Sequence, residues 1–227
     1  MRHPAVVIML ALLPLGCARD PALRSPLAAT SPVAASRGPA TDAGSTPVAG
    51  TFACPALKAG TGLFGVGTAD RVVFCIDASG SMIPRFLGVR DGLWAALGQL
   101  APKHSFNVVC FSSDTYFAVA PKPIPATAEN LRKARDFLTE YNAHGSSDPI
   151  PALRAAFAGD PQLVVFLTDG DFANNRAVFE EIRRLNARRA VKARVSTVAY
   201  QGSGDTYQEL LRQIATDNGG QYRFVGP

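Results

Sequence analysis

The feature that most constrains the fold is a short apolar run that ends in a polar loop. Val72–Ile76 are all apolar, and Asp77, Ser79 and Ser81 follow at alternate positions. An apolar run of this length, with turn-forming residues behind it, is typical of a strand buried on both faces of a parallel sheet. We therefore expect Asp77 to lie where the strand leaves the sheet, which is the edge at which open parallel sheets bind ligands.

The residue types in this loop favour a hard divalent cation. Asp77, Ser79 and Ser81 offer only oxygen atoms as ligands. Three oxygen atoms close together in one loop suit a hard cation better than zinc or copper.

The start of the chain has the pattern of a targeting segment. A short basic start precedes the apolar stretch Ala5–Leu15, which is too short to span a bilayer as a helix. Leu13–Cys17 resembles a bacterial lipobox, although Pro14 stands where such boxes usually have leucine. We expect a signal peptide over residues 1–16 and lipidation of Cys17, which would place the protein outside the cytoplasm, in the periplasm or at the outer membrane or cell surface. Secretion without a lipid and a retained anchor are the alternatives.

Composition divides the rest of the chain into two parts. Most of residues 17–50 are Ala, Pro, Ser, Thr or Gly, and such a segment cannot bury enough apolar surface to fold. We expect a disordered tether there. Residues 51–227 are expected to form one folded domain, with a glycine-rich opening segment to about residue 68.

Strand patterns alternate with helix patterns in the second part. Apolar residues spaced three or four apart predict helices, and short apolar runs between them predict strands. This alternation indicates an α/β fold: a doubly wound, mostly parallel, six-stranded sheet with helices on both faces. The expected strands are residues 72–76, 106–111, 115–120, 163–168, 195–200 and 222–225, and the expected helices run through residues 86–100, 127–141, 178–185 and 205–214.

Three motifs then give the chain a family resemblance. Asp77–Ser81, the turn Gly145–Asp148 and the segment Leu167–Gly170 occur in the order and at the spacing of a von Willebrand factor type A (VWA) domain. The resemblance covers about residues 65–227. It implies a Rossmann-like fold of the kind already expected from the strand and helix patterns.

The resemblance also implies a metal-ion-dependent adhesion site (MIDAS), formed by oxygen atoms from three loops. The ligands that it assigns are Asp77, Ser79, Ser81, Ser147 and Asp169. The family normally has threonine in the second loop, where Ser147 stands here; Ser146 is the alternative if the alignment shifts by one residue. Because serine lacks the methyl group that limits the rotamers of threonine, we expect weaker preorganisation of this ligand.

Mg²⁺ is the expected metal, with Mn²⁺ or Ca²⁺ as alternatives, because octahedral oxygen ligands suit it. By resemblance, the sixth ligand is an Asp or Glu residue of a protein partner. We therefore predict a binding module for adhesion or scaffolding and not an enzyme. We expect no nucleic-acid partner, and contact with a membrane only through a lipid at Cys17. The oligomeric state stays open.

Two other functions remain possible on the sequence. One is a metal-free structural or envelope-assembly module. The other is a metal-assisted hydrolase or phosphotransferase with Asp77 as nucleophile. Against the enzyme, Ser79 stands where haloacid-dehalogenase-like enzymes have a second aspartate. Asp171 is interpreted as a turn carboxylate, and Gly60–Gly65 precedes the first strand, so it lacks the context of a dinucleotide fingerprint.

The remaining cysteines and a basic cluster have open interpretations. Cys75 and Cys110 are either buried thiols or paired with each other, and Cys54 could instead pair with one of them. The basic residues between Arg183 and Arg194 are expected to form a solvated face, with contact to an anionic glycan or lipid headgroup as the alternative.

Overall fold

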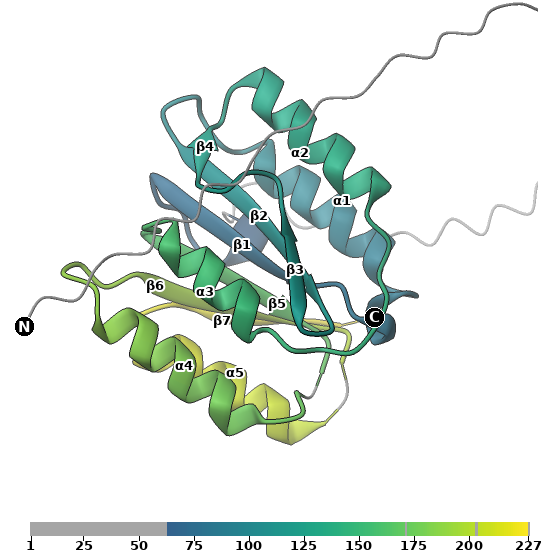
Figure 1. The fold of residues 1–227 in the computed structure, drawn as a ribbon, viewed down its shortest axis with the longest axis vertical. Helices are drawn as coiled ribbons and strands as arrows, with labels where there is room; N and C mark the ends of the chain where they lie inside the picture. Colours follow the sequence, from purple (N-terminus) through teal and green to yellow (C-terminus); the bar gives the residue numbers. More distant parts are fainter. Residues whose placement is uncertain (1–62, 171, 203, 227) are drawn as a thin grey trace, which may run out of the picture. The chain divides into compact units, whose positions relative to one another are not determined.

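The computed structural model describes residues 63–170, 172–202 and 204–226. These residues form the predicted α/β fold, a largely parallel sheet with helices on both faces (Figure 1). The predictions for the signal peptide, the lipidation site, the tether, Cys54 and Asp171 lie outside the described residues.

The sheet has one strand more than predicted. Its order is β3-β2-β1-β5-β6-β7, and β4 pairs with β2 at the end of that strand. Strands β2, β1, β5, β6 and β7 are parallel, whereas β3 and β4 run antiparallel to β2. The two-residue β4 was missed because it is too short, and contains a proline, to give a strand pattern. The strands are β1 (Arg71–Asp77), β2 (Ser105–Ser112), β3 (Thr115–Ala118), β4 (Ile124–Pro125), β5 (Leu163–Thr168), β6 (Arg194–Tyr200) and β7 (Tyr222–Val225).

The helices cover the two faces of the sheet in separate groups. Helices α1 and α2 lie on one face, and α3, α4 and α5 on the other (Figure 1). Helix α3 was not predicted, because it is short and mostly apolar and so has no clear amphipathic period. None of the described helices is long and apolar enough to cross a membrane. The helices are α1 (Phe86–Leu97), α2 (Ala128–Glu140), α3 (Ile150–Ala158), α4 (Asn175–Ala187) and α5 (Asp205–Asp217), with short 3₁₀ turns η1 (Leu63–Gly65) and η2 (Gly80–Met82).

Strand β1 is buried on both faces, as its apolar run predicted. Alternate side chains point to opposite layers: Phe74 and Ile76 pack with α1 and α2, and Val73 and Cys75 pack with α3, α4 and α5. Every residue from Val72 to Ile76 is at most 1% exposed. The strand can therefore hold the loop that follows it in a fixed position.

The strand register opposes a bond between Cys75 and Cys110. Cys75 pairs across the sheet with Val109, so Cys110 is displaced by one residue along β2. A displacement of one residue turns the side chain to the other face, and the two thiols indeed lie in different core layers. Cys75 and Cys110 are buried free thiols, and burial raises the pKa of both.

Helices α2 and α5 have recognisable signals at their ends. Thr127 caps α2, and its hydroxyl accepts a hydrogen bond from Asn130 N at 3.3 Å. Helix α5 stops at Asn218, and Gly219 adopts a left-handed conformation with φ of 61°. At the other end of α5, Gly204 is the N-cap and Asp205 is the first residue of the helix.

A buried glutamate joins α3 to α4. Glu181 of α4 accepts hydrogen bonds from Arg154 Nε of α3 and from Arg184 Nε, each at 2.7 Å. The hydrogen bond from Arg184, together with the one from Arg154 and both charges, lowers the pKa of Glu181 to about 2 although burial opposes this. The side chain of Glu181 is 9% exposed.

Several other residues of the basic cluster are also bonded within the domain. Arg189 donates to Pro161 O at 2.6 Å, and its side chain is 13% exposed. Arg194 donates to the carbonyl oxygen of Thr68. The prediction of one solvated basic face is therefore wrong for Arg189. The side chain of Arg184 is 39% exposed and Arg194 is exposed, so both remain solvated although they make contacts within the domain.

The Glu181 cluster gives a testable pH dependence. Glu181→Gln should lower the free energy of unfolding at pH 7 by about 1–2 kcal/mol, because two partly exposed guanidinium groups lose their carboxylate. Since the folded pKa is depressed, this stabilisation is present in full above the ordinary value of 4.5 and is lost as the pH falls toward 2. Urea denaturation of parent and variant should give free energies that converge over that range.

Glu180→Gln is the matched control for this prediction. Its carboxylate lies 3.9 Å from Arg183, and both side chains are exposed. This change should alter the stability by less than about 0.5 kcal/mol. If both variants lost the same free energy of unfolding, the stabilisation could not be assigned to the contacts of Glu181.

Candidate metal site

The candidate site lies at the edge of the sheet where β1 and β5 end. The two strands are adjacent and parallel, with Ile76 opposite Leu167. Asp77 and Asp169 stand at or just after their carboxyl ends, so both carboxylates reach the same edge. The buried apolar runs of the two strands fix this position.

Asp77 is buried and receives hydrogen bonds from three directions. Its Oδ1 accepts from Ser79 N at 2.9 Å, and its Oδ2 accepts from Ser147 Oγ at 3.0 Å and from Thr168 Oγ1 at 2.7 Å. The side chain has no cation against it among the described residues. Burial raises the pKa of Asp77, and the hydrogen bonds from Thr168, Ser79 and Ser147 only partly offset this effect.

The second loop is tied to the first by the backbone. Gly80 N donates to Gly145 O at 2.8 Å, and His144 N donates to Ala78 O at 2.9 Å. Gly145 has φ of 69°, and a Cβ atom there would lie 2.3 Å from Ser113 Oγ. This turn therefore needs glycine both for its conformation and for the close approach of Ser113.

Ser147, and not its neighbour, faces Asp77. The hydroxyl of Ser147 donates to the carboxylate, whereas Ser146 is exposed and accepts a backbone hydrogen bond from Ser113 N at 2.6 Å. A β-bridge between Ser113 and Ser147 fixes this register.

Asp169 completes the cluster through the serines of the first loop. Its Oδ1 accepts from Ser81 Oγ at 2.9 Å, and Ser81 Oγ lies 3.1 Å from Ser79 Oγ. The structure thus brings together the five residues predicted as ligands, which are Asp77, Ser79, Ser81, Ser147 and Asp169.

The spacing of these oxygen atoms fits a small hard cation. Adjacent ligands of an octahedral ion with bonds of about 2.0–2.1 Å are separated by about 2.9 Å. The serine and carboxylate oxygens of this cluster lie 2.9–3.1 Å from one another along its hydrogen bonds. Within the described ranges, no three His, Cys, Asp or Glu side chains gather as metal ligands, so the donors here are two carboxylates and hydroxyl groups.

Sequence reasoning missed two residues that contact the cluster. Thr168 precedes Asp169 and donates to Asp77; as the polar end of an apolar strand it gave a weak signal. Arg85 precedes α1, and its Nη1 donates to Asp169 Oδ2 at 2.9 Å and to Ser81 O at 2.7 Å. No sequence signal marked Arg85, because nothing local indicates that it reaches a residue 84 positions away.

Exposed apolar side chains follow the first loop of the cluster in the chain. Ile83 is 61% exposed and Leu87 is 65% exposed, although both lie close in sequence to Ser81. They border a hollow of about 220 Å³. Its lining residues are Ile83, Phe86, Leu87, Arg90, Tyr141, Asn142 and Ala143.

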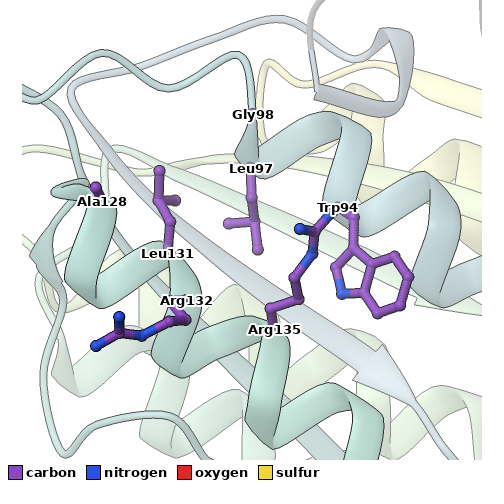
Figure 2. Close-up of a pocket in the computed structure, with 7 residues that line it drawn as sticks. All are labelled: Trp94, Leu97, Gly98, Ala128, Leu131, Arg132 and Arg135. Carbon is purple, nitrogen blue, oxygen red and sulfur yellow. The ribbon is translucent and has the colours of Figure 1, made fainter.

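A second hollow, of about 330 Å³, lies between α1 and α2. Figure 2 shows Trp94 and Leu97 of α1 facing Leu131 and Arg135 of α2 across it. The guanidinium carbon of Arg135 lies 5.0 Å from the centre of the Trp94 ring, as in a cation–π contact. This hollow contains none of the predicted ligands, and Arg135 partly fills it.

Comparisons with known proteins identify the domain. Residues 70–224 match the family model described as von Willebrand factor type A domain. Inter-alpha-trypsin inhibitor heavy chain H4 of Homo sapiens is 33% identical over 169 residues, which are 68% of this chain and 18% of that protein. The von Willebrand factor A domain-containing protein 3A of Homo sapiens is 29% identical over 164 residues, or 70% and 14% of the two chains. The chain therefore spans less than a fifth of these relatives.

Solved structures share the fold. The von Willebrand factor type A structure from Catenulispora acidiphila has a TM-score of 0.58 at 20% identity and covers 71% of this chain and 39% of its own. The pilus adhesin SpaC from Lactobacillus rhamnosus GG, in an open conformation, has a TM-score of 0.58 at 16% identity, with 71% and 28% covered. At these identities the likeness shows the fold alone.

The hydrogen bond from Thr168 to Asp77 can be tested by an isosteric change. Thr168→Val should lower the free energy of unfolding by about 1.5–3 kcal/mol, because a buried carboxylate loses a donor. Thr197→Val is the control: Thr197 is equally buried, but its hydroxyl donates to the neutral carbonyl of Leu211 at 2.8 Å. We expect a loss of about 0.5–1.5 kcal/mol there. Similar losses in urea denaturation would show that Asp77 does not depend on Thr168.

Proposed function

Since this chain belongs to the von Willebrand factor type A domain family, whose members engage other proteins, we propose that it is a metal-dependent protein-binding module. In this proposal, a divalent cation at the ends of β1 and β5 recognises an Asp or Glu residue of a partner. The observation that carries it is the cluster of hydroxyl and carboxylate oxygens at spacings of 2.9–3.1 Å.

The proposed ligands have distinct tasks. Ser79, Ser81 and Ser147 would offer neutral hydroxyl oxygens, while Asp77 and Asp169 would supply the negative charge directly or through water. When bound, Mg²⁺ would supply an acceptor position for one more carboxylate. Two carboxylates balance the charge of the ion without repelling an acidic partner.

The surroundings of Asp77 speak for binding and not for group transfer. Asp77 is 1% exposed, and both of its oxygens accept hydrogen bonds. A nucleophilic carboxylate has to reach a substrate, which this burial opposes. Ser79 also stands at the position where haloacid-dehalogenase-like enzymes have a second aspartate.

The surface beside the cluster suits a protein partner. Ile83 and Leu87, which follow Ser81 in the chain, expose apolar groups, and Arg85 and Arg90 lie in the same segment. Apolar anchors that surround a polar contact are common at protein interfaces. We infer a partner that presents an acidic residue flanked by an apolar one.

Location and anchoring also belong to the proposal. The pattern of residues 1–17 supports an extracytoplasmic protein with a lipid on Cys17. This chain matches only 18% and 14% of the length of the two curated relatives, so the partners of those proteins do not transfer to it.

Asp77→Asn tests the metal. It removes the charge of a central ligand while keeping the shape of the side chain, so Mg²⁺ affinity should fall roughly a hundredfold or more. Isothermal titration of purified protein with MgCl₂ measures this. Asp114→Asn is the control, because Asp114 is exposed and lies in the turn between β2 and β3. If the Asp77 variant titrates like its parent, the assigned site is wrong.

The same variants test the partner. Capture from an envelope extract should yield a protein that binds the parent and the Asp114 variant in Mg²⁺, and that is released by chelator. The Asp77→Asn variant should not retain it. Capture that is insensitive to chelator would favour the metal-free structural or envelope-assembly alternative.

Ser147→Thr tests the second-loop ligand. Threonine limits the rotamers of the hydroxyl, so Mg²⁺ affinity should rise by about two- to fivefold if Ser147 is a ligand. Ser146→Thr introduces the same methyl group at the exposed neighbouring position and should leave the affinity unchanged. If titration showed a higher Mg²⁺ affinity for Ser146→Thr and no change for Ser147→Thr, Ser146 would be the ligand of the second loop.

A further inference from the structure

Arg85 is the one cation that contacts the candidate ligands among the described residues. Its Nη1 lies 2.9 Å from Asp169 Oδ2 and 2.7 Å from Ser81 O. The side chain of Asp169 is only 4% exposed, whereas that of Arg85 is 29% exposed. The guanidinium group therefore covers the buried carboxylate from the solvent side.

The two carboxylates of the cluster are in different environments. Asp77 receives hydrogen bonds only from neutral donors, which are Ser79, Ser147 and Thr168. Asp169 receives one from a neutral hydroxyl and one from the charged Arg85. Half of the negative charge proposed for the metal is thus already paired with a cation.

A divalent ion and a guanidinium group compete for binding to the same carboxylate. Their charges repel, and both draw on the lone pairs of Asp169. The guanidinium group can turn toward water at little cost, because its side chain is 29% exposed and, within the described residues, two hydrogen bonds hold its end.

We propose that Arg85 is an internal competitor of the metal, which pairs with Asp169 when the site is empty and thereby sets the affinity of the site for divalent cations. This inference rests on the proposed metal site and adds a residue that tunes it.

The competitor role predicts effects of opposite sign in the two states. Arg85→Gln should destabilise the metal-free protein, because Asp169 loses its cation. The same change should raise Mg²⁺ affinity about tenfold or more, because the metal no longer has to displace a positive charge. A purely structural role for Arg85 would instead lower both quantities.

Isothermal titration with MgCl₂ and thermal denaturation in chelator or in Mg²⁺ test this on the whole protein. Arg85→Lys keeps the charge and should stay within about threefold of the parent. Arg71→Gln removes the same charge from the start of β1, where Arg71 pairs with the exposed Asp160, and should not change the affinity. The increase in melting temperature on adding Mg²⁺ should be largest for Arg85→Gln.

The outcomes separate this inference from the proposed function. If the parent binds Mg²⁺ and Arg85→Gln binds it equally or more weakly, Arg85 does not compete, and only the inference fails. Binding by Arg85→Gln but not by the parent supports the inference and makes the natural site metal-free. Binding by neither overturns the metal site, and the inference with it. If Arg71→Gln raised the Mg²⁺ affinity as much as Arg85→Gln does, the cause would be the net charge of the protein and not Arg85, and the inference would also be overturned.

Discussion

Asp77 places a carboxylate inside the protein with 1% of its surface exposed, and its hydrogen bonds hold the rest of the site in position. An ionised carboxylate in such a place costs several kcal/mol unless donors surround it. Here the donors come from three segments far apart in sequence: Ser79 in the same loop, Ser147 and Thr168. Because all three must meet at one carboxylate, the positions of the loops are coupled. The cluster of oxygen atoms follows from this coupling.

The sheet makes such a meeting possible. The parallel register of β1 with β5 brings Asp77 and Asp169 to the same edge. The second loop is held beside them by the bridge from Ser147 to Ser113, the residue after β2, and by the hydrogen bond from Gly80 N to Gly145 O. Burial of β1 on both faces prevents the strand from shifting, because a shift of one residue would exchange the two core layers. The same alternation separates Cys75 from Cys110 and leaves both as free thiols.

The electrostatics of the site are asymmetric. Asp77 depends on neutral donors, and its raised pKa reflects the burial that they only partly offset. Asp169 has Arg85, and Glu181 on the opposite layer has Arg154 and Arg184. Asp169 and Glu181 are thus paired with arginine, whereas Asp77 has no cation against it within the described residues.

The sequence by itself determined the α/β fold, the main strands, four of the five described helices and the residues of the candidate cluster. Apolar runs and helical spacing are local properties, and the motifs at Asp77, Gly145 and Asp169 are contiguous, so they can be recognised without a structure. Helix α3 and strand β4 were not predicted, because β4 is too short and α3 too uniformly apolar to show a hydrophobic period. Only the tertiary structure decided that Ser147 and not Ser146 meets Asp77, that Thr168 supports it and that Arg85 pairs with Asp169. These contacts join residues 70, 91 and 84 positions apart, and no local pattern encodes which side chains meet across such separations.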